Sequence, residues 1–323
     1  MKKLFLLVAT GFLIVTSCNK NSSPSHESSV ANEPALTERK CATNEVLEKQ
    51  LRIDPSLAQR MNDIEAFTRR YAEQHEANKL QPDGTMEIPV VVNVLYRTQA
   101  ENISDAQIAS QIAVLNEDFS GTNGDVNNTS TYGNVKAGDI KIHFTLKTTV
   151  RKSTTTTSFS TNDAMKKLPN GIPPTDPAAN LNIWVCTLSG GVLGYAYYPG
   201  VRSDVDGVVI LNTAFGRVGT AVAPFDLGRT ATHEVGHYFN LIHIWGDRRC
   251  GDDKVGDTPS HDAANFGCPQ PGLISKCKDK EVEMTMNYMD YTDDACMYMF
   301  SSGQASRMQA TFAAGGPRAS LRK

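Results

Sequence analysis

Two histidines and a glutamate at fixed spacing are the residues in this sequence best suited to chemistry. His233 and His237 are four residues apart, so on a helix both imidazoles lie on one face and can bind one zinc ion. Glu234 then projects beside the metal, where its carboxylate can take a proton from a water held there. Chance placement of these residue types, with a further histidine downstream, is expected in about one chain in 10⁴. A coincidental pair of surface or core histidines is therefore a poor alternative.

The next histidine, His243, lies ten residues after His233. In a continuous helix it would sit about 15 Å farther along the axis and point about 80° away. It joins the site only if the helix ends and the chain doubles back through a residue with φ > 0. Asn240 is the candidate, because asparagine tolerates that region better than other non-glycine residues. Three histidines would leave one position of a tetrahedral zinc ion open for water.

The run HEVGHYFNLIH at 233–243 resembles the zinc motif HExxHxxGxxH of the metzincin peptidases, with Asn240 in place of the usual glycine. The run NYMDY at 287–291 resembles the Met-turn of that clan. Within the clan, the sequence is most similar to the pappalysin family, in particular its ulilysin-like bacterial members, over about residues 86–315. A gluzincin fits less well, because the next glutamates after Glu234 are as distant as Glu281 and Glu283.

The resemblance implies a zinc-dependent endopeptidase in which Glu234 is the general base. Tyr291 would help to hold the oxyanion, and Met289 would form an apolar floor beneath the histidines. Asp294, with Asp293 beside it, would favour Lys or Arg after the scissile bond. The residues alone leave two alternatives open, a packed aromatic ring for Tyr291 and solvated loop carboxylates for the two aspartates.

The segment 190–196 resembles the upper rim of the family's active site, where an edge strand pairs with an extended substrate. The resemblance places Gly191, Leu193 and Gly194 against the substrate backbone, and the glycines permit that close approach.

Oxygen-bearing side chains are dense between residues 252 and 258, and hard oxygen ligands suit calcium. The spacing is not that of an EF-hand, so the calcium site rests on the family, whose members bind calcium here. The tentative ligands are Asp252, Asp253, Asp257 and Thr258.

The cysteines fall into two groups. Four late cysteines can form two disulfides in three pairings, and the resemblance favours Cys250–Cys277 and Cys268–Cys296. Cys186 ends an apolar strand and is expected to be a buried free thiol. Cys41, two residues after Arg39, resembles the cysteine switch of latent pro-forms, in which a thiolate binds the zinc. The alternatives are a disulfide between Cys41 and Cys186 or a spare thiol.

The N-terminus has the features of an export signal. Two lysines precede a 12-residue apolar run at 4–15, too short to span a membrane. The following sequence VTSC resembles a bacterial lipobox, which predicts a lipoprotein-type signal peptide at 1–17 and a lipidated Cys18. An ordinary signal peptide is the alternative. Residues 18–37 are rich in Ser, Asn and Pro and are expected to form a flexible tether. The protein is thus expected to be exported from a bacterium, as an envelope lipoprotein or in secreted form.

Helical spacing of apolar residues over 44–78 predicts a helical pro-segment, bounded at 38–84. Strands are expected at 87–97, 139–147, 181–186 and 207–212, with helices from Ser104, from near Asp226 and over 302–313. The expected fold class is α+β and metzincin-like. A twisted mixed sheet with backing and active-site helices would form an upper subdomain at 85–243. An irregular lower subdomain at 244–323, stapled by disulfides and calcium, would end in a helix.

Composition supports a packed protein without affinity for nucleic acid. Hydrophobic residues make up 40% of the chain and the formal net charge is −3, which gives no basic footprint. The expected partners are peptides or proteins as substrates, with membrane contact only through the N-terminal lipid and a monomeric state. The alternative function is a lipid-anchored binding protein on an inactive peptidase scaffold; the intact Glu234 and histidines favour the enzyme.

Overall fold

The computed structural model describes residues 36–78, 84–128 and 131–322. The expected signal peptide, the lipidated Cys18 and nearly all of the tether lie outside these residues. In the described part, no helix combines the length and apolar character needed to cross a membrane. The helices are α1 (Thr43–Ile53), α2 (Ser56–Asn78), α3 (Asp105–Ser120), α4 (Arg229–Tyr238) and α5 (Ser302–Phe312). The strands are β1 (Met86–Tyr96), β2 (Ile142–Ser153), β3 (Leu181–Cys186), β4 (Gly194–Ala196) and β5 (Val208–Leu211).

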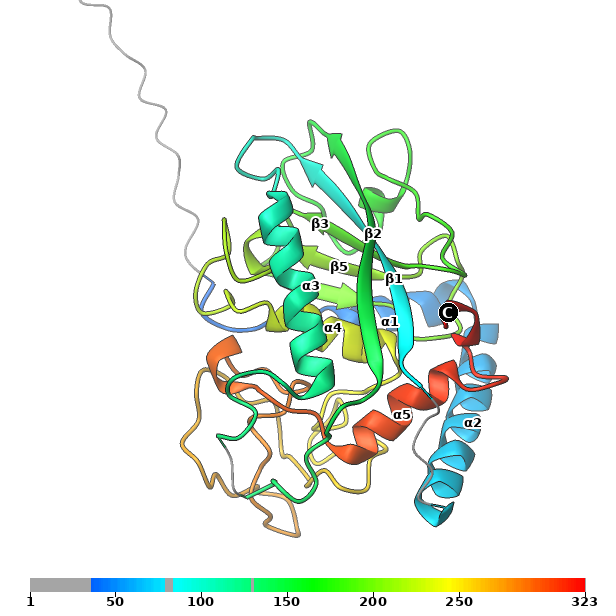
Figure 1. The fold of residues 1–323 in the computed structure, drawn as a ribbon, viewed down its shortest axis with the longest axis vertical. Coiled ribbons are helices and arrows are strands. Elements are labelled where there is room, and N and C mark those ends of the chain that lie inside the picture. The colour runs from blue at the N-terminus through cyan, green and yellow to red at the C-terminus, as the bar shows by residue number, and fades with distance from the viewer. Residues whose placement is uncertain (1–35, 79–83, 129–130, 323) are drawn as a thin grey trace, which may run out of the picture. The chain divides into compact units, whose positions relative to one another are not determined.

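The five strands form one mixed sheet in the order β2-β1-β3-β5-β4 (Figure 1). All neighbouring pairs are parallel except β4 and β5, which makes β4 an antiparallel edge strand. Strand β2 begins and ends later than its sequence pattern predicts. Its second half is polar and carries no apolar alternation, but it pairs with β1 along the whole length of that strand. Backbone pairing at an edge therefore sets its bounds.

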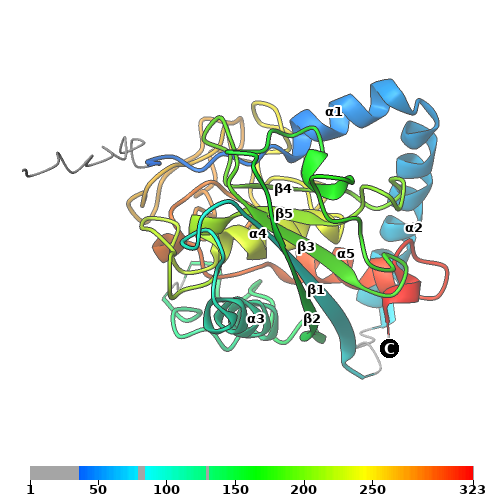
Figure 2. The same cartoon turned by 90° about the horizontal axis from the view of Figure 1, so that it is seen from above.

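Alternate side chains of the sheet enter two separate cores. Ile183 and Val185 of β3 face the helices α3 and α4, together with every second residue of β1 from Met86 to Val94. Trp184 and Cys186 face the opposite side, where α1 and the segment around Met165 cover the sheet. Because both faces are covered, the central strands are mostly apolar, with Asn93 and Asn182 as buried polar exceptions. Figure 2 shows α3 and α1 on opposite sides of the strands.

The helix that carries the HExxH residues begins at Arg229, later than the expected start near Asp226. Gly228, with φ of 80°, precedes the first turn in the left-handed region. The N–H groups of Leu227 and Arg229 donate to the carboxylate of Asp294 instead of entering an earlier helical turn. A tertiary contact, which no local pattern reveals, thus sets this boundary.

The segment ahead of β1 forms two helices rather than one, because Asp54 and Pro55 interrupt the helical spacing. Helix α2 packs along α5, near the C-terminal end of the chain (Figure 1). Glu65 of α2 forms a bidentate ion pair with the buried Arg307 of α5, at 2.8 and 3.1 Å.

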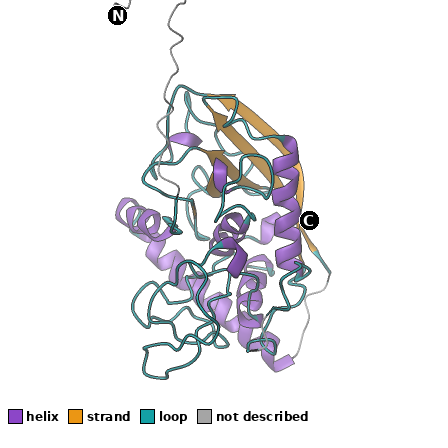
Figure 3. Ribbon diagram, turned by 90° about the vertical axis from the view of Figure 1, so that its left-hand side faces the viewer, coloured by secondary structure: helices purple, strands orange, loops and turns teal. Residues whose placement is uncertain are grey.

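The chain between α4 and α5 is mostly loop (Figure 3). Disulfides join Cys250 to Cys277 and Cys268 to Cys296, which is the pairing that the resemblance favoured. Cys186 is a buried free thiol, as its apolar strand predicts. The α+β, metzincin-like fold class is confirmed.

Candidate active site

Helix α4 and the turn after it bring the three histidines together in the buried interior. His233 and His237 lie one helical turn apart on α4. Asn240 has φ of 73°, so the chain doubles back as the position of His243 requires. All three histidine side chains are at most 1% exposed. The structure therefore brings the three predicted histidines together at this turn.

Each histidine is oriented through its Nδ1 atom. His233 donates from Nδ1 to the backbone carbonyl of Tyr288 at 2.7 Å, and His237 donates to that of Leu241 at 2.8 Å. The Nδ1 atom of His243 lies 2.5 Å from a carboxylate oxygen of Asp247. Since carbonyl and carboxylate oxygens only accept hydrogen bonds, these partners place the proton on Nδ1 and leave every Nε2 with a free lone pair.

These three lone pairs converge on one point. The Nε2 atom of His237 is 3.2 Å from that of His233 and 3.0 Å from that of His243. Nitrogen ligands of a tetrahedral zinc ion are about 3.3 Å apart. Unprotonated nitrogens this close repel one another unless a cation lies between them. The geometry therefore fits zinc.

Burial keeps the rings of His233 and His237 neutral. It is the largest cause that lowers the pKa of His233 well below its ordinary value, with the neighbouring His237 and His243 adding to the effect. The same causes lower the pKa of His237 to about 3. Neutral imidazole is the form that binds metal, so the surroundings prepare the ligands for it.

The thiol of Cys41 completes the group. One ligand atom from each of Cys41, His233, His237 and His243 lies within 4.8 Å of the others. Burial, followed by the nearby Glu234 carboxylate, raises the pKa of this thiol well above its usual value. A thiolate here therefore needs a bound cation, which deprotonates a coordinating thiol.

Glu234 is buried beside the histidines and touches two residues of the N-terminal segment. Its Oε2 atom lies 3.4 Å from Sγ of Cys41 and accepts a hydrogen bond from the Thr43 hydroxyl at 3.0 Å. Burial raises the pKa of Glu234 to about 7, against the smaller lowering by these contacts and by Arg39. Gly194 faces this carboxylate, and a Cβ there would lie 2.9 Å from the Glu234 Cγ atom.

Met289 and Tyr291 both lie in the segment 287–291, where Met289 packs against α4 and Tyr291 against the histidines. Met289 is fully buried, and a Cβ on Gly236 of α4 would lie 2.5 Å from its sulfur, so glycine is required there. The Tyr291 ring centroid is 4.9 Å from that of His243, and its hydroxyl donates to the carbonyl oxygen of Cys41 at 3.2 Å.

Asp294 is buried and binds Arg39 of the N-terminal segment through a 2.6 Å ion pair. The same guanidinium donates to the Thr230 hydroxyl at 3.0 Å and to the Thr292 carbonyl at 3.1 Å. It also lies over the ring of Phe225. Asp293 forms no hydrogen bond or ion pair with Arg39; burial raises the pKa of Asp293, and the charge of Arg39 opposes that rise. Of the two aspartates, Asp294 alone forms this ion pair.

The edge strand β4 pairs with the N-terminal segment. Leu193 donates from its backbone to the carbonyl of Lys40 at 2.9 Å, and Ala42 donates to the carbonyl of Gly194 at 3.0 Å. The bridge between Cys41 and Gly194 is parallel. A Cβ on Gly191 would meet the Leu36 side chain at 3.4 Å.

The four tentative calcium ligands do not form one cluster. Asp252 pairs with Lys254, and Asp257 accepts hydrogen bonds from Ser301 and the backbone of Gly303 at the start of α5. Only Asp253 and Thr258 meet, at 2.9 and 3.0 Å, with the Val255 carbonyl 3.0 Å from the threonine hydroxyl.

Sequence reasoning missed several residues of this site. Thr43 and Asp247 are close in sequence to Cys41 and His243, so a search for polar neighbours at short spacing would have found them. Thr230 and Phe225 contact the Arg39 side chain from far away along the chain. No pattern in the sequence indicates that contact.

Comparisons with known proteins agree with this geometry. The family model Peptidase_M43, described as pregnancy-associated plasma protein-A, matches residues 175–313. Extracellular metalloprotease 1 of Coccidioides posadasii is 34% identical over 237 residues, or 70% of this chain and 76% of that protein. An extracellular metalloprotease of Pyricularia oryzae is 33% identical over 240 residues, or 69% and 72%.

Solved structures are similar to this chain in both sequence and fold. Mature mirolysin of Tannerella forsythia, in complex with a cleaved peptide, is 43% identical with a TM-score of 0.71, covering 75% of this chain and 97% of that one. A mutant of promirolysin from the same organism is 40% identical with a TM-score of 0.79, covering 88% and 97%. Given a cluster of histidines that fits zinc and relatives matched over most of their length, this chain belongs to the pappalysin family of zinc metalloendopeptidases.

Proposed function

We propose that Glu234 is the general base of peptide hydrolysis in this enzyme. His233, His237 and His243 would hold a zinc ion, which would supply a Lewis acid for the scissile carbonyl and would lower the pKa of water. The Glu234 carboxylate takes a proton from the attacking water and delivers it to the leaving amine. The observation that carries this role is the position of the Glu234 carboxylate, which is buried beside three histidines whose geometry fits zinc.

Tyr291 and β4 position the substrate in this proposal. The Tyr291 hydroxyl donates to a backbone carbonyl, that of Cys41, right beside the histidines. In the mature enzyme the same hydroxyl would donate to the scissile carbonyl oxygen as negative charge develops on it. The backbone groups of Leu193 and Gly194, which bind the N-terminal segment here, would pair with an extended substrate.

The test of the general base is Glu234→Ala. It should keep the fold and the zinc content but reduce turnover by about 10² to 10⁴-fold. Peptide hydrolysis and metal content are measured on the same preparation. Glu117→Ala is the control, because that glutamate forms an exposed ion pair with Arg217. Retained hydrolysis at normal zinc content would exclude the role.

We further propose that the enzyme prefers Arg or Lys immediately after the scissile bond. The support is the side chain of Arg39, whose guanidinium meets Asp294, the Thr230 hydroxyl and the Thr292 carbonyl at once. A substrate arginine can use the same planar set of acceptors, whereas a lysine can use fewer of them. Asp294 is then the specificity residue of the primed side.

Residues 38–84 are proposed to keep the enzyme latent as a pro-segment. Cys41 would occupy the open zinc position, Thr43 would engage the Glu234 carboxylate, and Arg39 would fill the primed-side subsite. The match to the pro-form of mirolysin, which covers more of this chain than the mature form does, supports this reading.

Two finer proposals concern calcium and export. The oxygens of Asp253, Val255 and Thr258 supply part of a calcium shell, which takes six to eight oxygens in general. The side chains of Asp252 and Asp257 bind other groups.

Secretion is supported by the extracellular relatives. A lipid on Cys18 would tether the zymogen until a cut after that residue releases the catalytic domain.

A further inference from the structure

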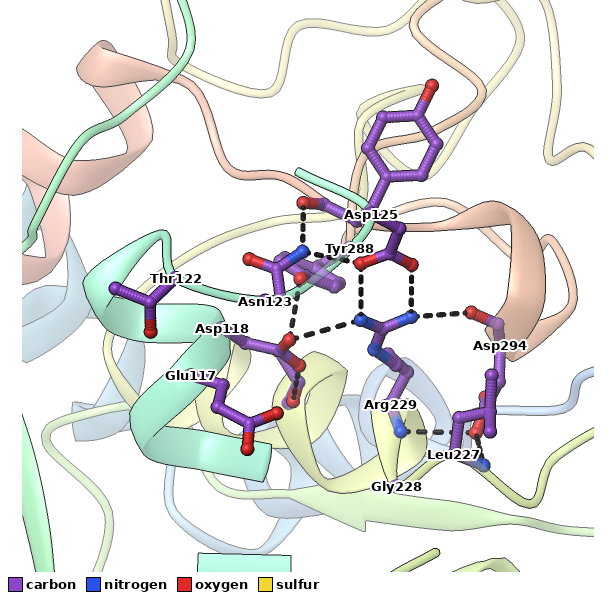
Figure 4. Close-up of polar contacts among 12 residues, drawn as sticks. Glu117, Asp118, Thr122, Asn123, Asp125, Leu227, Gly228, Arg229, Tyr288 and Asp294 are labelled. Carbon is purple, nitrogen blue, oxygen red and sulfur yellow. Dashed lines mark hydrogen bonds and ion pairs between the residues drawn. The ribbon is translucent and has the colours of Figure 1, made fainter. Parts of the chain in front are cut away.

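A buried arginine outside the metal site connects three segments that meet beside Asp294 (Figure 4). Arg229 is the first residue of α4, and its side chain is 7% exposed. Its guanidinium donates to both carboxylate oxygens of Asp125, at 2.9 Å each, and lies 3.4 Å from Asp118 at the end of α3. The guanidinium also donates to the backbone carbonyl of Asp294 at 3.0 Å.

Arg229 thereby holds Asp294 at two points. Besides the contact with the backbone carbonyl, the main-chain N–H of Arg229 donates to Oδ2 of Asp294 at 3.1 Å, and that of Leu227 donates to the same oxygen at 2.9 Å. The other carboxylate oxygen, Oδ1, is the one that binds Arg39. One oxygen is therefore anchored to the start of α4, and the other faces the incoming cation.

The partners of Arg229 are themselves fixed. Asp118 accepts hydrogen bonds from the hydroxyls of Thr232 and Tyr288, both at 2.7 Å. Burial raises the pKa of Asp118 to about 6, and Arg229 is the main group that opposes this rise. The arginine charge is thus shared by Asp118 and Asp125. The charge of Asp294 is left for a cation that arrives at Oδ1.

We propose that Arg229, braced by Asp118 and Asp125, is a positioning residue that fixes Asp294 for recognition of a basic side chain on the primed side. It does not touch the substrate. The inference rests on the proposed preference for Arg or Lys and explains how a single carboxylate keeps one orientation. A lysine at this position lacks the fork that reaches Asp125 and the Asp294 carbonyl together.

The test uses the chain expressed in full and allowed to mature, with zinc content and folded fraction recorded. Two peptides, identical except for Arg or Leu after the scissile bond, give kcat/KM and KM for each variant. The variants are Arg229→Met, which keeps the apolar stem, and the milder Asp125→Asn. Arg217→Met is the matched control, because Arg217 also pairs with a carboxylate of α3 but is exposed.

The quantity that decides is the ratio of kcat/KM for the Arg peptide to that for the Leu peptide. Arg229→Met should lower this ratio by about 10-fold or more, mainly by raising KM for the Arg peptide. Asp125→Asn should lower it by about 3-fold, and Arg217→Met should leave it unchanged. A purely structural role would reduce both peptides equally and keep the ratio within about twofold of the parent; that result overturns the proposal.

Should Arg229→Met fail to fold, the same criterion is applied to Asp125→Asn. The peptide preference of the parent enzyme distinguishes an error in the proposed specificity from an error in the proposed role of Arg229. If the parent itself does not prefer the Arg peptide, the proposed specificity is wrong and the role of Arg229 is overturned with it. If the parent prefers Arg and the variants keep that preference, only the role of Arg229 is overturned.

Discussion

Glu234 and Asp294 are both buried carboxylates, but their surroundings suit them to different roles. Glu234 contacts only a hydroxyl and a thiol, and burial raises its pKa to about 7, so it can accept and return a proton. Asp294 accepts two backbone hydrogen bonds and pairs with a guanidinium. It is held as a fixed anion for binding a cation. In the proposed mechanism, two carboxylates of one site thus separate base chemistry from recognition.

Replacement of the proposed specificity residue should change selectivity far more than turnover. Asp294→Ala removes the anion that a substrate Arg or Lys would meet. Cleavage before those residues should fall at least about 30-fold, equivalent to about 2 kcal/mol, while cleavage before Leu changes little. Peptide pairs are compared by kcat/KM. The neighbouring Asp293→Ala is the control, and an equal effect of the two substitutions would contradict the assignment.

Asp118 should make stability depend on pH. Burial, the largest cause, raises its pKa from 3.8 to about 6, which corresponds to about 3 kcal/mol. Since the native state binds this proton more tightly than the unfolded chain, the stabilisation is full below pH 3.8 and is lost as the pH rises through about 6. Asp118→Asn should lack this change.

The measurement is the free energy of unfolding of parent and variant at pH 4 and pH 7, on a Glu234→Ala background that prevents self-digestion. The variant should gain stability relative to the parent as the pH rises, by up to about 3 kcal/mol. Asp139→Asn serves as control, because Asp139 is exposed beside Lys141. A difference that does not vary with pH would show that Asp118 keeps an ordinary pKa.

At the scale of elements, local sequence patterns predicted the features that depend on residues close together in the chain. The four-residue spacing of His233 and His237 and the asparagine at 240 are local, and they were sufficient to predict the helix, the turn and the three-histidine cluster. Contacts between residues far apart in the sequence are not indicated by any local pattern. Arg39 and Asp294 are 255 residues apart, and Arg229 and Asp125 are 104 apart. These contacts set the start of α4 and give Asp294 its two arginine partners. The resemblance pointed to Asp294 itself, but no pattern in the sequence indicates that Arg39 and Arg229 both meet it.

The loop-rich segment between α4 and α5 should depend on calcium. Added calcium should raise the melting temperature of the Glu234→Ala zymogen by a few degrees, because a ligand that binds only the folded state stabilises it by mass action. Asp253→Asn should abolish this shift. Asp252→Asn should retain it, since Asp252 pairs with Lys254. Melting curves that do not respond to calcium would refute the site.

Considered as a whole, the N-terminal segment contacts both the histidine cluster and the turn that delivers His243. Residues 39–43 meet the histidines, Glu234 and Asp294. Helix α2 contacts that turn, where Thr68 accepts a hydrogen bond from Asn240 and Glu65 pairs with Arg307. Arg307 also binds the carbonyl of Asn240, the turn that delivers His243. Removal of the segment would therefore uncover the site and loosen a support of the same turn.

Latency and location should change together in Cys41→Ala. Loss of the thiol opens the fourth zinc position, so self-cleavage should begin earlier than in the parent and shift the catalytic domain from the membrane fraction to the medium. Activity and fractionation are followed over time. Cys186→Ala is the control, since Cys186 is the other free cysteine of the described chain. A Cys41→Ala protein that stays latent as long as the parent would rule out the thiol as the inhibitory ligand.

The short edge strand has a consequence for behaviour at high concentration. Once the N-terminal segment leaves β4, the sheet has an uncovered edge, and uncovered edges can recruit other chains into aggregates. Strand β4 spans only Gly194–Ala196, so it offers few backbone groups to a second copy. The opposite edge, β2, is longer but carries Lys147, Arg151 and Lys152, and charged side chains deter such pairing. With the proposed pro-segment removed, the enzyme would therefore expose a strand for its substrate and still resist self-association.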